Sequence, residues 1–273
     1  LSDKKSDGIN STTPSNSSYN PDKDGYEIKS SSGSLSYYLS KDHELGLSYL
    51  YSDGWTRYDK GLTSDYKTLE TISNISAFSK NKVNTNWAST VRVGQSVDDS
   101  PGSKDGVQTS LYKTTQNQFQ WQNDIKLTFG SALIAVERLQ QNVDSSTIYS
   151  VKDRAINSYL AGWTGSNGRH RLQTNLRQDN NSQFGSKITG LISYGYSIST
   201  NLSGNVSWGT AFKAPSFNNL YYPGFSNADL KPESANNKEV SVHYVTDKHQ
   251  TSVTYYQNDV TNLIQATSSN NYI

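Results

Sequence analysis

The chain has 273 residues, of which 33% are hydrophobic and 18% are charged, against about 45–50% and about 25% in a typical soluble domain. Ser, Asn, Thr, Gln and Gly fill the difference, and 19 Tyr and 5 Trp make the chain too aromatic for a disordered polymer. This balance suits a β-sheet with a single apolar face.

Several classes of protein are excluded by what the sequence lacks. Because it contains no Cys, it cannot form disulfides, thiolate metal sites or a cysteine nucleophile. A net charge of +1 provides no basic stripe, so we expect no nucleic-acid partner. No window approaches the roughly 20 apolar residues of a membrane helix, although a β-barrel crosses a membrane with strands of only about ten alternating residues.

Apolar residues recur at every second position along most of the chain. Leu45, Leu47 and Tyr49, for example, alternate with Gly46 and Ser48. The pattern predicts about twelve strands and no helical stretch, with the strands at 26–39, 43–52, 66–79, 84–96, 112–128, 131–140, 156–164, 169–178, 186–196, 202–210, 237–246 and 250–262.

Short and long connections are predicted to alternate between these strands. Short turns are expected at 40–42, 129–130, 165–168, 198–200 and 246–248. Long loops are expected at 53–65, 97–111, 141–155 and 211–236. This alternation is typical of an antiparallel transmembrane β-barrel, with tight periplasmic turns and long extracellular loops. A soluble β-sandwich, a propeller or a fibre protein remains the alternative.

One long segment resembles a known family. Residues 209–221 read GTAFKAPSFNNLY and residues 227–234 read NADLKPES, and together they closely resemble a motif of TonB-dependent outer-membrane receptors. Residues 177–185 and 256–264 are similar to further barrel segments of that family. The run YYPGF at 221–225 and the acidic loops are most like the cobalamin (vitamin B12) receptors. That aromatic run would serve either as a ligand platform or as part of the girdle and loop packing at the membrane interface.

The resemblance implies both a fold and a function. Receptors of this family are 22-stranded barrels with a plugged lumen, so residues 1–273 would be a partial barrel of about 12 strands, with the plug domain and the C-terminal strands absent. We expect a transporter for cobalamin or another large, scarce nutrient in the outer membrane of a Gram-negative bacterium. Lipid would contact the apolar face, and the TonB complex would act through the absent plug. The alternatives are a siderophore or haem receptor, or a structural or adhesive β-protein.

Acidic residues are clustered in two of the connections. Asp22 and Asp24 stand two residues apart beside Asn20, and hard oxygen donors of this kind suit calcium, although Asp and Asn are also common in ordinary turns. Asp59 and Asp65 lie on the next long loop, one hairpin away and therefore at the same end of a barrel. Two loops could then share calcium ions.

By resemblance, these loops would order on calcium and touch substrate. The implied calcium ligands are Asn20, Asp22, Asp24, Asp59 and Asp65, with a backbone carbonyl from Tyr58 and with Asn10 where the family has a carboxylate. A hydroxyl of the 97–111 loop, on Thr109 or Ser110, would contact substrate.

Nothing in the sequence indicates an enzyme. The four His residues, at 43, 170, 243 and 249, are scattered and have no metal-ligand spacing. A nucleophile elbow of the Gly-x-Ser-x-Gly type is also absent. We therefore predict a binding and transport protein.

Overall fold

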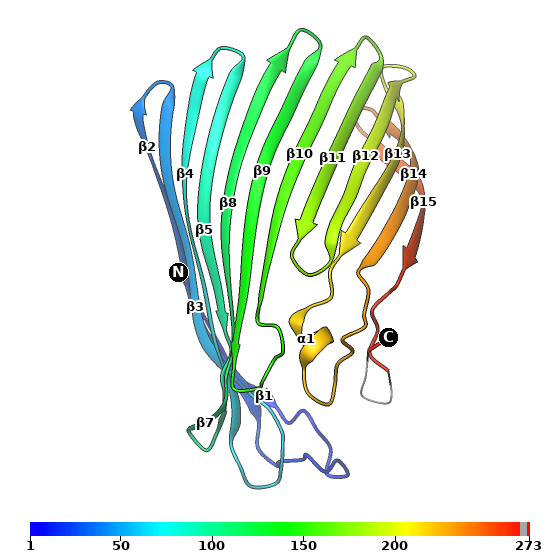
Figure 1. Ribbon diagram of the computed structural model, residues 1–273. Helices are drawn as coiled ribbons and strands as arrows, with labels where there is room; N and C mark the ends of the chain where they lie inside the picture. Colours follow the sequence, from blue (N-terminus) through cyan, green and yellow to red (C-terminus); the bar gives the residue numbers. More distant parts are fainter. Residues whose placement is uncertain (268–271) are drawn as a thin grey trace. The chain divides into compact units, whose positions relative to one another are not determined.

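The computed structural model describes residues 1–267 and 272–273, and that part of the chain is almost entirely β-strand (Figure 1). The elements are β1 (Ser2–Ile9), β2 (Asp24–Ser40), β3 (His43–Arg57), β4 (Tyr66–Asn84), β5 (Trp87–Asp99), β6 (Gly102–Lys104), β7 (Val107–Ser110), β8 (Tyr112–Leu127), β9 (Gly130–Ser145), β10 (Asp153–Asn167), β11 (His170–Asn181), β12 (Gly185–Ser197), β13 (Leu202–Lys213), α1 (Phe217–Tyr221), β14 (Glu233–Val245) and β15 (Gln250–Thr261). Within the described residues, no helix is long and apolar enough to span a membrane.

The strands form an antiparallel sheet in which neighbours along the chain are neighbours in space. The order runs β1-β2-β3-β4-β5-β8-β9-β10-β11-β12-β13-β14-β15, and the short strands β6 and β7 form a side hairpin that pairs with β4. β1 and β15 stand at the two ends of this order. The all-β, antiparallel class predicted from the alternation is therefore confirmed, and all twelve predicted strands are present.

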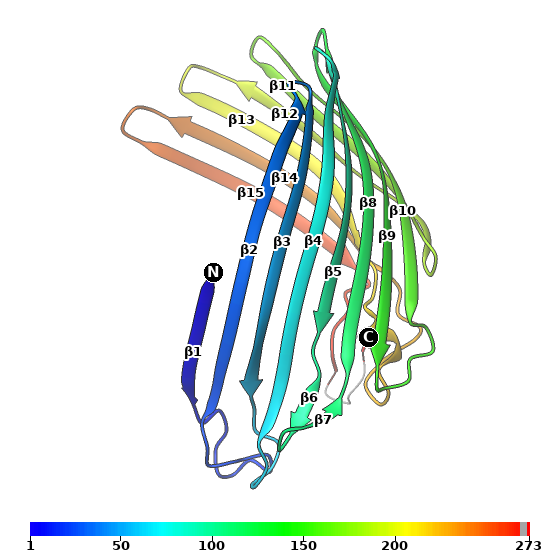
Figure 2. The ribbon, with the colours of Figure 1, turned by 90° about the vertical axis from the view of Figure 1, so that its left-hand side faces the viewer.

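The chain divides into two compact units, which we describe separately. The first comprises Leu1–Ser79, Arg92–Phe119 and Leu139–Asp153, and the second comprises Lys80–Val91, Gln120–Arg138 and Arg154–Ile273. In the first unit, the loops at 10–23 and 58–65 lie at the same end of the strands as the β6–β7 hairpin (Figure 2). The second unit contains most of the short turns, together with the long 214–232 loop that carries α1.

One face of the sheet exposes large apolar side chains within each unit. In the first unit Leu47 lies opposite Leu35 across β2 and β3, and these side chains are 46% and 72% exposed. In the second unit one row runs across β12 to β15 through Tyr194, Val206, Val240 and Tyr255, all exposed. Polar residues occupy the alternate positions, as period-two patterning requires. The predicted apolar face therefore does not pack into a closed core.

The strands differ from the prediction in three ways. β4 continues to Asn84, and the turn to β5 falls at 85–86 because the Asn84 Oδ1 accepts the Asn86 N–H at 2.8 Å and closes an Asx turn. β1 was not predicted, because its sequence SDKKSDGI has no apolar alternation, yet it pairs with β2 over Ser2–Ile9. The strands also extend into the predicted loops, since the sheet ladder continues where side chains become polar; β9, for example, runs to Ser145.

Two further expectations were wrong. A short helix, α1, exists at Phe217–Tyr221, where Ser216 and Asn219 form a capping box. The strict alternation of long and short connections fails between β11 and β12, where residues 182–184 make a tight turn at the end expected for long loops. There the Asn181 Oδ1 accepts the N–H groups of Gln183 and Phe184, and Gly185 takes a φ of 71°.

Candidate functional site

Three carboxylates gather where the 10–23 loop meets the 58–65 loop in the first unit. Asp22, Asp24 and Asp59, the acidic triad, each offer one oxygen atom, and these three atoms all lie within 4.8 Å of one another. Two like charges about 4 Å apart repel by about 1 kcal/mol in water and by about 4 kcal/mol near a protein surface. A cation at this position would remove that repulsion.

Local backbone geometry places Asp24 at the start of β2. Gly8 of β1 has a φ of 70°, and a Cβ atom on it would overlap the carbonyl oxygen of Asp24. Only glycine permits this close approach in that conformation. The β1–β2 register shifts between Ser6 and Ile9 at the same point, so an irregular end of the ladder sets the position of the carboxylate.

Hydrogen bonds join the two loops around the triad. The Thr12 hydroxyl donates to Asp59 Oδ2, and the Ser11 N–H donates to Asp24 Oδ2 at 3.0 Å. Farther along, the Gly61 N–H donates to the Ser18 carbonyl at 3.0 Å. Asp59 Oδ1 is buried without a hydrogen-bond partner in the described part of the chain. A buried, unpaired carboxylate oxygen is costly, and a bound cation would satisfy it.

Three further predicted calcium ligands lie around this cluster. Asn10 donates from Nδ2 to the Asn20 carbonyl at 2.6 Å, and Asn20 donates from its own Nδ2 to the Ser64 carbonyl at 3.4 Å. Tyr58 is bonded through its N–H to the Tyr66 carbonyl at 3.2 Å. These residues lie beside the acidic triad in sequence or on the loops that carry it, and their role in binding stays a prediction.

Asp65 lies outside the acidic triad and forms ion pairs with two basic side chains. Its Oδ1 lies 3.1 Å from Arg57 Nε and its Oδ2 lies 2.8 Å from Lys67 Nζ. The backbone N–H of Asp65 donates to Asp105 Oδ1 at 2.8 Å. To bind calcium, Asp65 would have to give up one of these ion pairs.

Thr109 and Ser110, the predicted substrate contacts, lie on β7 of the β6–β7 hairpin. The Thr109 hydroxyl donates to the Gly102 carbonyl at 3.3 Å, and Ser110 Oγ accepts the Gly102 N–H at 3.1 Å. Ser110 therefore keeps its hydroxyl proton for another acceptor. The hairpin pairs with β4 through Tyr66 and Lys104, so it stands next to the 58–65 loop.

Sequence reasoning missed the residues that organise these loops. Thr12, Arg57 and Lys67 carry no sequence pattern that singles them out, and their partners, Asp59 and Asp65, lie on the 58–65 loop. Asp105 had a readable signal, since Asp105-Gly106 is a hairpin dipeptide. Both residues have positive φ, 51° and 80°, as a type I′ turn requires.

In the second unit, a buried arginine holds the 214–232 loop. Arg154, at the start of β10, is 6% exposed and donates from Nη2 to the Pro215 carbonyl at 3.0 Å. Its guanidinium lies over the rings of Phe217 and Phe184, at 4.7 Å and 5.4 Å from their centroids. The Tyr221 hydroxyl accepts a hydrogen bond from the side-chain amide of Gln183.

In the segment that carries the family resemblance, the apolar residues therefore serve to pack the 214–232 loop. Pro215, Phe217 and Leu220 are buried in that packing. Phe225 packs edge-on against Tyr272 at 4.9 Å, so the aromatic run at 221–225 serves loop packing, and a ligand role for it stays a prediction.

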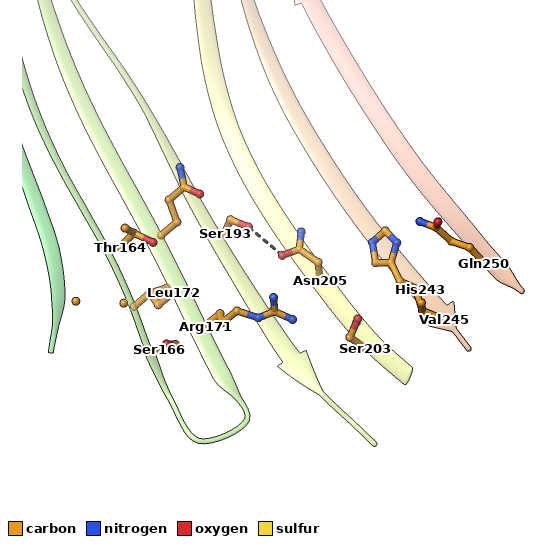
Figure 3. Close-up of a pocket in the computed structure, with 15 residues that line it drawn as sticks. Thr164, Ser166, Arg171, Leu172, Ser193, Ser203, Asn205, His243, Val245 and Gln250 are labelled. Carbon is orange, nitrogen blue, oxygen red and sulfur yellow. Dashed lines mark hydrogen bonds between the residues drawn. The ribbon is translucent and has the colours of Figure 1, made fainter. Parts of the chain in front are cut away.

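A cavity of about 770 Å³ lies on the polar face of the second unit, close to the short turns (Figure 3). Arg171 is the one formally charged residue among its described lining residues, and His243 is the one other ionisable group. Ser193 donates to Asn205 at 3.0 Å within it. Two of the four His residues have side-chain partners in the second unit: His170 bonds to the Tyr194 hydroxyl at 2.6 Å, and His243 contacts Ser241 Oγ at 3.1 Å.

Comparison with protein families defines the class. Residues 2–273 match the family described as TonB dependent receptor-like, beta-barrel, and the chain belongs to that family. The family comprises transport receptors and not enzymes, in agreement with the sequence analysis. Its members are outer-membrane β-barrels of Gram-negative bacteria.

Relatives of this chain include vitamin B12 transporters. The chain is 27% identical over 273 residues to the vitamin B12 transporter BtuB of Photobacterium profundum. The aligned region covers 95% of this chain and 43% of that protein. It is also 27% identical over 292 residues to the same transporter of Vibrio vulnificus, and this alignment covers 97% of this chain and 44% of that protein. The chain thus spans less than half the length of these relatives.

Solved structures with the same fold include siderophore receptors. A ferric enterobactin receptor, PfeA, from Pseudomonas aeruginosa matches with a TM-score of 0.78 at 16% identity, over 94% of this chain and 46% of that one. The siderophore receptor PirA from the same species matches with a TM-score of 0.74 at 19% identity, over 91% of this chain and 48% of that one. At these identities the likeness concerns the fold alone.

Proposed function

We propose that this chain forms part of the barrel of an outer-membrane receptor that takes up cobalamin. The observation that supports this most is the 27% identity to vitamin B12 transporters over 95% of the chain. The solved siderophore receptors share the fold, so a ferric siderophore is the second candidate ligand.

In this proposal the exposed apolar face lies against membrane lipid. Side chains such as Leu47 and Val206 would be costly in water as a continuous face, and lipid removes that cost. The polar face then lines the lumen. The TonB complex would supply energy through a plug domain of the whole receptor, because residues 2–273 match barrel only.

We also propose that calcium binds the acidic triad and orders the 10–23 and 58–65 loops. Carboxylate and carbonyl oxygens are the donors that calcium prefers, and it takes six to eight of them. Asp22, Asp24 and Asp59 provide the carboxylates, and the unpaired, buried Asp59 Oδ1 supports a ligand there. Asn10, Asn20, Tyr58 and Asp65 are the further candidates.

The ligand is tested by direct binding to the full-length protein in outer-membrane vesicles. Labelled cyanocobalamin and ferric enterobactin are titrated separately, with calcium and with a chelator. We expect saturable cyanocobalamin binding that calcium strengthens, and no saturable ferric enterobactin binding. Saturable binding of ferric enterobactin without cyanocobalamin binding would replace the first candidate with the second.

A further inference from the structure

The tip of the β6–β7 hairpin is joined to the 58–65 loop by two reciprocal hydrogen bonds. The Asp65 N–H donates to Asp105 Oδ1 at 2.8 Å, and the Asp105 N–H donates to the Asp65 carbonyl at 2.9 Å. Asp105 and Gly106 form the turn of the hairpin. The pair therefore fixes the end of the hairpin that lies farthest from its base at Gly102 and Ser110.

Asp65 is itself fixed to the strands on both sides of its loop. Arg57 is the last residue of β3 and Lys67 is the second residue of β4, and each contacts a different carboxylate oxygen of Asp65. The loop thus closes on Asp65, which cannot move without breaking ion pairs to two strands. The ion pairs hold the Asp65 side chain, and the Asp65 backbone, through its N–H and carbonyl, holds the hairpin tip.

The base of the hairpin is bonded closely through Gly102. A Cβ atom on Gly102 would overlap Ser110 Oγ, so the two hairpin strands touch there. The Leu69 N–H also donates to the Pro101 carbonyl at 2.9 Å just before the hairpin. The base fixes where the hairpin leaves the sheet, and the tip contact fixes its direction.

The acidic triad and the hairpin are joined through the 58–65 loop. Asp59 of the triad lies near the start of that loop and Asp65 ends it, while Gly61 donates and Ser64 accepts a bond to the 10–23 loop. Thr109 and Ser110 end β7, the strand of the hairpin that pairs with β6 and not with β4. A continuous series of contacts therefore connects the triad to both hydroxyls.

We propose that the Asp65–Asp105 pair positions Thr109 and Ser110, so that Asp65 is a positioning residue for the substrate contacts. The assignment of those hydroxyls to substrate rests on the family resemblance and, with it, on the proposed function. A cation at the triad would order the 58–65 loop, and the hydrogen bonds of the Asp65–Asp105 pair would then restrict the motion of the hairpin. Linkage then requires that substrate strengthen calcium binding by the same factor.

Two substitutions at Asp105 separate this role from a general effect on folding. Asp105→Gly removes the side-chain acceptor and keeps the positive φ without strain. Asp105→Asn keeps an Oδ1 acceptor and also tolerates this conformation, so it is the matched control. Val107 is 68% exposed and residues 1–273 contain no Cys, so Val107→Cys provides a site for a nitroxide spin label on the hairpin.

The experiment records spin-label mobility and cyanocobalamin affinity of the full-length protein in membrane vesicles, with calcium and with chelator. We expect Asp105→Gly to make the label mobile even in calcium and to weaken cyanocobalamin binding about fivefold, as the loss of one hydrogen bond predicts. Asp105→Asn should restore both properties. Equal mobility in the wild type and Asp105→Gly, or a failure of Asp105→Asn to restore it, would overturn the proposal. A wild type that binds neither cyanocobalamin nor calcium would defeat the proposed function, while label mobility would still decide the role of the pair.

Discussion

Asp59 differs from the other two carboxylates of the acidic triad in its surroundings. Its Oδ2 accepts a hydrogen bond from Thr12, while its Oδ1 is buried and unpaired in the described structure. Asp22 is exposed, and Asp24 Oδ2 accepts from Ser11. Asp59 is therefore the carboxylate that gains most from a cation, because water cannot reach the oxygen that lacks a partner.

Replacing Asp59 with Asn should weaken calcium binding by about tenfold or more, since loss of even an indirect ligand contact costs that much. Calcium titration calorimetry of the purified full-length receptor measures the affinity. The control is Asp247→Asn, which changes the same charge on the exposed turn at 246–249. A calcium affinity equal to that of the control would show that the triad is an ordinary acidic turn.

At the scale of elements, Arg154 joins β10 to the 214–232 loop by two different interactions. It donates to the Pro215 carbonyl and to Gln183 Oε1, at 3.0 Å and 3.2 Å, and it stacks on the ring of Phe217. Lysine lacks the planar fork that makes both possible. The loop therefore depends on the guanidinium and not on positive charge alone.

Arg154→Lys should loosen the 214–232 loop by about 2 kcal/mol of local opening free energy, from the lost hydrogen bond and the lost cation–π contact. Hydrogen exchange of the loop amides reports this directly. Arg169→Lys is the control, because exposed Arg169 makes one bond to the Ile198 carbonyl at 3.1 Å. Unchanged exchange in Arg154→Lys, relative to this control, would contradict the anchoring role.

The elements that could be predicted are those with a repeating pattern. The twelve long strands were readable because one face of each is apolar, as in β3 and β12. β1 and α1 were not, since β1 is held by its ladder to β2 and α1 by contacts of Phe217 with Arg154. The acidic residues of the site were found from their chemistry, whereas the contacts of Thr12 with Asp59 and of Asp105 with Asp65 could not be predicted, because the fold brings together segments that are distant in sequence.

At the scale of the whole molecule, the proposed membrane barrel would place the two faces of the sheet in different solvents. Leu47 and Ser48 are successive residues of β3 and point to opposite faces. Leu47 is 46% exposed on the apolar face, while Ser48 Oγ bonds to Ser76 Oγ at 2.8 Å on the polar face. They form a matched pair that reports which face contacts lipid.

Leu47→Arg should therefore impair membrane assembly far more than Ser48→Arg. A charged residue on the lipid face of a β-barrel costs about 2–4 kcal/mol near the bilayer midplane, whereas a polar lumen tolerates it. The fraction of folded receptor in outer membranes, read from its altered mobility in unheated gel electrophoresis, measures the difference. If both variants assemble equally well, the apolar face does not contact lipid, and the assignment of the sheet to a membrane barrel with a wet lumen is wrong.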